Sequence, residues 1–143
     1  MSWSTFPLLA VAGSLSLLAS ALHVAVLFGG PAWYRRFGAG ERIARLAEAG
    51  HWYPVVVTSF VALMLLVWAG YAFSGASLLP RFPLLKPALC AIAGVYLLRG
   101  LVIVPMVLFA FDRVTGFWVW SSLVCLIYAA AYGLGLIQAW PRL

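Results

Sequence analysis

The sequence predicts an all-α membrane protein, in which four helices cross a bilayer as an antiparallel four-helix bundle. Hydrophobic residues make up 66% of the 143 residues and charged residues only 8%, whereas a soluble domain carries about 25% charged residues. A globule of this size still exposes roughly 30% of its unfolded surface, so water is a poor solvent for this chain. The apolar residues form four runs of the roughly 20 residues that a helix needs to cross a bilayer. They lack the alternation of apolar and polar residues that is typical of barrel strands.

Glycine and proline separate the four predicted spans. The first span ends at Gly29-Gly30-Pro31, the second at Ser74-Gly75 and the fourth before Pro141. The sequence Asp112 to Thr115 predicts a tight turn, which makes the last two spans an antiparallel hairpin. We expect the spans at about residues 7–28, 54–73, 84–111 and 116–139, within a single transmembrane domain over residues 1–143.

The longest connection, between the first two spans, predicts a short amphipathic helix. It lies between Gly38 and Gly50 and places Ile43, Leu46 and Ala47 on one side. Glu41 and Arg45 are four residues apart, a spacing that supports a helix through an ion pair. Four aromatic residues flank this segment at the depth expected of lipid headgroups, namely Trp33, Tyr34, Trp52 and Tyr53. We therefore expect the short helix to lie in the plane of the membrane interface.

The positive residues predict the orientation of the spans. The first and third connections carry five of them: Arg35, Arg36, Arg42, Arg45 and Arg113. The opposite side carries three: Arg81, Lys86 and Arg142. Because cytoplasmic loops are enriched in Lys and Arg, the five-cation side is expected to be cytoplasmic and both termini periplasmic.

The net charge of +6 is explained by orientation and by anionic lipid headgroups, rather than by nucleic acid. The preference for Arg over Lys, with abundant Ala, Gly and Leu, is typical of GC-rich bacterial genomes. The first span has no Lys or Arg before it, so we interpret it as a retained span and not as a signal peptide. These features predict that the protein lies in the inner membrane of a bacterium.

Arg99 is the residue that most constrains function. It lies 13 residues from Lys86 and 13 from Asp112, at the ends of the third span, so about 20 Å of helix separates it from either end. Arginine keeps its proton in proteins, and a charge at the bilayer centre costs at least about 2.5 kcal/mol. A polar group or a ligand must therefore solvate Arg99.

Several groups are candidates for solvating Arg99. The carbonyl of Leu101 is free, because Pro105 has no N–H to donate, and it would act together with Tyr128 and water. A carboxylate reaching in from the interface, from Glu48 or Asp112, is another candidate. An anionic ligand in a water-accessible cavity is the remaining one.

Polar residues on the first and fourth spans extend the candidate binding site. Ser16, Ser20 and His23 follow one another on one face of the first span, where serine also favours close helix packing. An intramembrane histidine is either a ligand or proton carrier, or a neutral donor to a carbonyl. On the fourth span one stripe would line a cavity near Arg99: Trp118, Ser121, Cys125, Tyr128, Tyr132 and Gly135. The predicted ligand-binding residues are Arg99, Ser16, Ser20, His23 and Tyr128.

An interfacial site is a further hypothesis. Glu48, His51 and Asp112 combine acids with a base near headgroup depth, where they would serve lipid headgroup chemistry. The alternative is that the glutamates pair with Arg42 and Arg45 on a solvated face. Two histidines also ligate haem iron in some proteins, so His23 and His51 make haem a weaker hypothesis. No sequence motif predicts a metal site or a known catalytic centre.

Two sequence runs resemble small four-span inner-membrane proteins of bacteria that have no assigned activity. They are Gly-Gly-Pro-Ala-Trp-Tyr-Arg-Arg-Phe-Gly-Ala-Gly-Glu-Arg at 29–42 and Val-Tyr-Leu-Leu-Arg-Gly at 95–100. The resemblance covers nearly the whole chain and implies the topology and a bacterial origin, with no mechanism to carry over.

Three functions follow from these residues. The first is a binding or transport protein that holds an anionic small molecule or a lipid headgroup near Arg99. The second is a structural or accessory membrane subunit without a ligand, and the third is an interfacial enzyme or a haem- or quinone-linked redox protein. The expected partners are membrane lipids and a second copy of the chain, with Ala129 and Gly133 as contacts of a homodimer.

Overall fold

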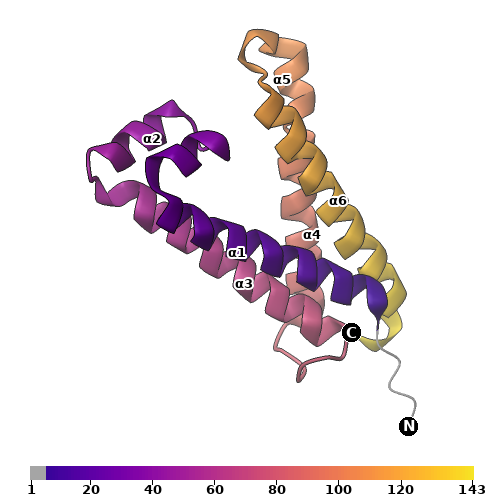
Figure 1. Cartoon of the computed structure of the whole chain (residues 1–143). Helices are drawn as coiled ribbons and strands as arrows, with labels where there is room; N and C mark the ends of the chain where they lie inside the picture. The colour runs from indigo at the N-terminus through magenta and orange to yellow at the C-terminus, as the bar shows by residue number, and fades with distance from the viewer. Residues whose placement is uncertain (1–5) are drawn as a thin grey trace. The chain divides into compact units, whose positions relative to one another are not determined.

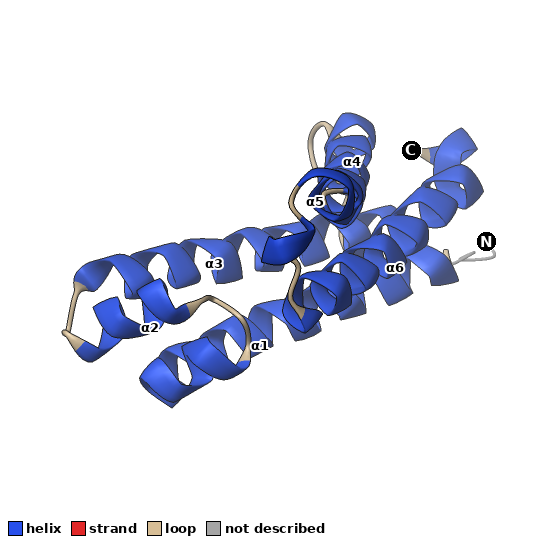
Figure 2. Ribbon diagram, turned by 90° about the horizontal axis from the view of Figure 1, so that it is seen from above, coloured by secondary structure: helices blue, strands red, loops and turns tan. Residues whose placement is uncertain are grey.

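The computed structural model describes residues 6–143, and every regular element among them is helical (Figure 2). The elements are α1 (Pro7–Arg36), α2 (Glu41–Glu48), α3 (Trp52–Gly75), α4 (Leu85–Leu101), α5 (Ile103–Phe109), η1 (Phe111–Arg113), α6 (Gly116–Ala139) and η2 (Trp140–Arg142). The predicted all-α class is confirmed, with four long apolar helices and a short helix between the first two. These elements are compatible with a four-helix bundle.

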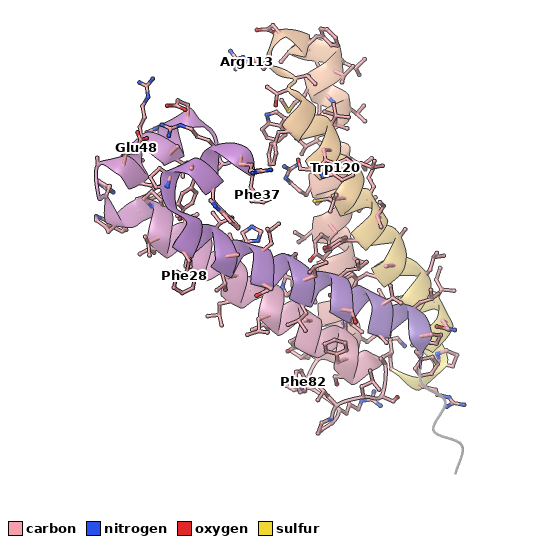
Figure 3. All side chains as sticks on the ribbon, viewed as in Figure 1. Phe28, Phe37, Glu48, Phe82, Arg113 and Trp120 are labelled. Atoms are coloured by element: carbon pink, nitrogen blue, oxygen red, sulfur yellow. The ribbon has the colours of Figure 1, made fainter. Side chains whose placement is uncertain are left out.

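Four helical stretches are long and apolar enough to cross a membrane. They are Pro7–Arg36, Trp52–Gly75, Leu85–Phe109 and Gly116–Arg142, with a mean hydropathy between 1.7 and 2.2 in their most apolar windows. Only 17 to 28% of each window is buried within the protein, and Phe28, for example, is 87% exposed (Figure 3). So much exposed apolar surface needs lipid around it, which makes the chain a multi-pass membrane protein.

The first helix extends beyond its predicted end at residue 28, because the Gly-Gly-Pro sequence kinks it without ending it. Gly30 has φ 67° and ψ −157°, and helical structure resumes after it up to Arg36. Glycine adopts this positive φ at little cost. Pro31 then stands in the first turn of the resumed helix, where its missing N–H would have had no partner.

The third span, predicted as one continuous stretch, is interrupted shortly before Pro105. Helix α4 ends at Leu101 and α5 begins at Ile103. Pro105 cannot donate a hydrogen bond to the Leu101 carbonyl, and its ring crowds the preceding turn. The interruption, at Val102, therefore lies three residues after Arg99.

Contacts divide the chain into two compact units, each described by itself. The α4–α6 unit comprises residues 6–15 and 68–143, and the α2 unit comprises residues 16–67. Helices α1 and α3 each contribute a segment to both units. The predicted single domain over the whole chain stays a prediction.

Close packing of small and aromatic residues builds the α4–α6 unit, in which α4 and α6 lie side by side (Figure 1). Leu9, wholly buried, fits against Gly75 and Gly135, where an added methyl group would come within 3.0 Å of it. Beside it, Tyr96 packs its ring against Tyr128, Tyr132 and Trp68, with centroids 5.1 to 5.5 Å apart. We call these four aromatic residues the tyrosine cluster.

The α2 unit is organised by the amphipathic pattern of α2. Ala44 is wholly buried and packs with Val26 and Tyr34, while Ile43 and Ala47 complete this small core. Tyr34 is therefore buried within the protein, and its place at headgroup depth stays a prediction. Its hydroxyl donates to the Pro54 carbonyl (3.3 Å) and accepts from Thr58 Oγ1 (3.2 Å). With both hydrogen bonds made, the Tyr34 hydroxyl needs no hydrogen bond to water.

Candidate functional site

Arg99 lies in the last turn of α4, close to the middle of the Leu85–Phe109 span. Its Nη2 donates to Ser121 Oγ on α6 at 3.1 Å, and its guanidinium carbon lies 4.9 Å from the centre of the Trp118 ring. A cation over an indole face is attractive, more so when water is excluded. The C-terminal end of a helix also favours a positive charge. These contacts hold the guanidinium between α4 and α6, but none of them neutralises it.

One nitrogen of that guanidinium has no hydrogen-bond partner. Among the residues that the structure describes, the buried side-chain polar atoms without a partner are Arg99 Nη1 and Ser122 Oγ. Ser122 follows Ser121 directly on α6 and is 1% exposed. A buried donor without a partner costs about 1–3 kcal/mol, and more when it is charged. The unpartnered Nη1 of Arg99 indicates a place for a further polar group beside this side chain.

The partner of Arg99 differs from those that the sequence suggested. The Tyr128 hydroxyl donates to the Leu15 carbonyl at 2.8 Å, and the hydrogen bond of Arg99 goes to Ser121 instead. Sequence reasoning placed Ser121 on the lining stripe without linking it to Arg99. Counting residues from the turn gave no signal for this contact, because Arg99 lies 11 residues before residue 110 whereas Ser121 lies only 6 residues after residue 115. Tyr128 lies further along the pair, in the tyrosine cluster.

Ser16, Ser20 and His23 of the first span lie in the α2 unit, and Ser20 and His23 bond to backbone carbonyls. Ser20 Oγ donates to the Ala62 carbonyl at 2.7 Å and so joins α1 to α3. His23 Nδ1 donates to the Ala19 carbonyl one turn earlier, at 2.7 Å. Ser16 is wholly buried. The contacts of Ser20 and His23 match the packing alternative, in which these side chains satisfy carbonyls.

Arg35 organises the charged surface of the α2 unit. Its Nε and Nη2 donate to the two oxygens of Glu41 at 2.9 and 3.0 Å, and its Nη1 donates to Glu48 at 2.7 Å. Arg45 Nε adds a contact of 3.1 Å to Glu41, at the predicted i, i+4 spacing. The fork-shaped pairing of arginine with a carboxylate is geometrically favourable. Glu48 thus pairs with Arg35, at the end of α1, and not with a neighbour on its own helix.

These hydrogen bonds shift the acidity of both glutamates. Hydrogen bonds from Arg35 and then Arg45 lower the pKa of Glu41 to about 2, against an ordinary value of 4.5. The hydrogen bond from Arg35 also lowers the pKa of Glu48. Both are therefore carboxylates at neutral pH, and neither is poised to act as an acid.

The predicted interfacial site receives no support from these contacts. His51 stacks on Trp52, and its Nδ1 accepts the backbone N–H of Tyr53 at 3.1 Å. Glu48 is held by Arg35. Asp112 is exposed in η1, in the α4–α6 unit. In the described part of the chain, no group of three or more His, Cys, Asp or Glu side chains is placed to hold a metal ion.

No protein-family model, curated protein or solved structure matches this chain. The arrangement around Arg99 must therefore be interpreted from its chemistry. A fixed guanidinium with a free, buried donor can bind and orient an oxyanion, because its planar fork matches carboxylate and phosphate oxygens. It cannot serve as a base, because it keeps its proton.

Proposed function

We propose that this membrane protein binds, or transports, an anionic small molecule or lipid headgroup, with Arg99 as the cation that holds the anion. The unpartnered, buried Nη1 of Arg99 in the middle of a span is the observation that supports this. Ser121 and Trp118 fix the other side of the guanidinium, so Nη1 is presented in a defined direction. An oxyanion there would satisfy the donor and neutralise the charge together.

The proposed setting is the inner membrane of a bacterium, with both termini periplasmic. The distribution of Lys and Arg between the two sides supports the orientation, and the composition supports the bacterial origin. Membrane lipids are the proposed partners, together with a second copy of the chain. A methyl group added to Gly133 would contact nothing within 4 Å, which leaves room for the close helix approach that small residues permit.

The test is a native mass spectrum of the full chain, released from mild detergent. We expect a stoichiometric bound mass in the wild type that is lost in Arg99→Gln and retained in Arg113→Gln, a matched change at the exposed turn η1. Ser121→Ala, which removes the other partner of Arg99, should weaken the bound mass without abolishing it.

Other spectra would point to the other functions. A bare polypeptide in the wild type, with reduced thermal stability in Arg99→Gln, would overturn binding and favour the structural or accessory subunit. A haem-sized mass lost in His23→Ala would favour the redox protein.

A further inference from the structure

The end of the α4–α6 unit where α4 begins and α6 ends carries a second group of cations. Arg81 lies in the α3–α4 connection, Lys86 in the first turn of α4, and Arg142 in η2. The acid that this unit has in its sequence, Asp112, lies at the other end of the hairpin. No Asp or Glu of the same unit is therefore placed in sequence to match the charges of Arg81 and Lys86.

The contacts of Arg81 and Lys86 hold these two cations in place without neutralising them. Arg81 Nη1 donates to the Arg142 carbonyl at 3.3 Å. Lys86 Nζ lies 4.0 Å from the centre of the Trp140 ring. A carbonyl oxygen and an indole face attract a cation, but neither carries the full negative charge that would offset it. Arg81 and Lys86 are thus both held as charged groups at this end of the α4–α6 unit.

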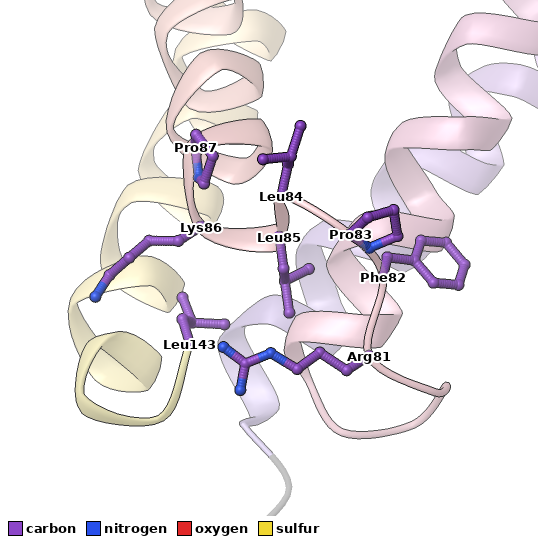
Figure 4. Close-up of a pocket in the computed structure, with 8 residues that line it drawn as sticks. All are labelled: Arg81, Phe82, Pro83, Leu84, Leu85, Lys86, Pro87 and Leu143. Atoms are coloured by element: carbon purple, nitrogen blue, oxygen red, sulfur yellow. The ribbon is translucent and has the colours of Figure 1, made fainter.

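A cavity of about 520 Å³ opens between these two cations (Figure 4). Apart from Arg81 and Lys86 its lining is apolar: Phe82, Pro83, Leu84, Leu85, Pro87 and Leu143. A smaller cavity of about 190 Å³ shares Arg81, Leu85 and Leu143 with it and reaches Ser74, Ser77 and Arg142. The larger volume lies in the range of small-molecule sites, about 300–1,000 Å³. Two cations on an apolar wall suit a molecule with an anionic head and an apolar body.

The backbone at the cavity turns one leucine inward and one outward. Leu85 is buried, whereas the preceding Leu84 is 77% exposed and has a left-handed conformation with φ 52°. Such a conformation is costly for a leucine and marks a locally constrained backbone. The connection is braced by Ser74, whose Oγ donates to the Pro80 carbonyl (2.7 Å) and accepts from the Phe82 N–H (3.0 Å). The exposed Leu84 therefore provides an apolar surface next to the charged residues of the cavity.

We infer that this cavity binds the phosphate of an anionic lipid, with Arg81 and Lys86 as its ligands and Leu84 against its acyl chains. The position suits this chemistry, because the cavity lies at the end of membrane-spanning helices, where headgroup phosphates are found. Basic pockets between transmembrane helices bind anionic headgroups by charge attraction. This site is separate from Arg99, which lies 13 residues after Lys86 along α4.

The experiment measures lipid retention by the full chain. Native mass spectra are recorded after adding equal amounts of phosphatidylglycerol and phosphatidylcholine of the same acyl length. We expect the wild type to retain the anionic lipid at least about five-fold over the zwitterionic one, which corresponds to about 1 kcal/mol. The double variant Arg81→Gln/Lys86→Gln should lose this preference, and added salt should weaken it in the wild type.

Control variants separate this site from folding and from the other cations of the chain. Arg81→Lys/Lys86→Arg keeps both charges and should keep the preference, and so should Arg113→Gln, a change in the exposed turn η1. Equal retention of both lipids by the wild type, or an unchanged preference in the glutamine double variant, would overturn the inference. Inorganic phosphate is added as a separate probe: displacement of the lipid at equal concentration would show a site for free phosphate and would overturn the lipid assignment.

Discussion

Arg35 and Arg99 are the same side chain in two different situations. In the α2 unit, Arg35 directs all three guanidinium nitrogens at carboxylates, two at Glu41 and one at Glu48. In the α4–α6 unit, Arg99 has a serine hydroxyl and an indole face, and its Nη1 is buried without a partner. The exposed arginine therefore has more hydrogen bonds than the one in the middle of a span.

The difference shows that an arginine is available to a ligand only where no acid of its own unit pairs with it. Where acids are in reach, as around Arg35, the cation becomes part of the scaffold. At Arg99 and at the cavity beside Arg81 and Lys86, where no acid of the same unit pairs with the cation, we propose that the cation stays available to an anion from outside the chain. Both proposed sites belong to the α4–α6 unit.

The largest expected effect comes from disturbing the contact that positions Arg99. A methyl group on Gly100 would lie 2.7 Å from Leu126 side-chain atoms and 3.1 Å from the Leu126 backbone nitrogen on α6. Gly100→Ala should therefore push α4 away from α6 and destabilise the protein by about 1–3 kcal/mol. Thermal unfolding in detergent measures this loss, together with loss of the bound mass.

Gly94→Ala is the matched control on the same helix, because a methyl group there meets nothing within 4 Å. It should leave stability unchanged or raise it slightly, since alanine favours a helix over glycine. Equal behaviour of the two variants would show that α4 and α6 are not held by close packing at Gly100.

Lowering the pH should have a smaller effect on stability, and this effect should arise in the α2 unit alone. The pKa of Glu41 is lowered to about 2 when folded, from an ordinary 4.5, so its ion pairs stabilise the fold above pH 4.5. This contribution is lost as the pH falls from about 4.5 towards 2, because the carboxylate takes up a proton. The ¹³C shift of the Glu41 carboxylate should titrate with a midpoint near 2, while resonances of the tyrosine cluster stay unchanged. A midpoint near 4.5 would show that Arg35 does not hold this acid in solution.

Much of the fold could be predicted from the sequence, because the bilayer imposes a simple length rule on apolar helices. The fourth helix has the predicted bounds, Gly116–Ala139. The first helix was predicted too short, because a Gly-Pro sequence such as Gly30-Pro31 is compatible both with a kink and with the end of a helix. The burial of Tyr34 was not predicted. Its aromatic ring suits the interface, but its burial depends on contacts with Pro54 and Thr58 of α3.

The site was only partly predictable. The position of Arg99 in the span follows from counting residues, but its contact with Ser121 depends on how α4 and α6 are rotated against each other. The pairing of Arg35 with Glu48 required the chain to turn back through α2. The cavity beside Arg81 and Lys86 gave no sequence signal beyond two cations near a proline-rich connection.

The most direct test of the central claim is ¹⁵N NMR of the arginine side chains, with the full chain in nanodiscs of phosphatidylcholine. Short-chain phosphatidic acid is then added as an anionic probe. We expect the Nη resonances of Arg99 to shift and their rotation to slow as Nη1 gains an acceptor, while the resonances of Arg35 stay where they are. Unchanged Arg99 resonances, already slow to rotate before any anion is added, would contradict the account and make Arg99 a structural residue like Arg35.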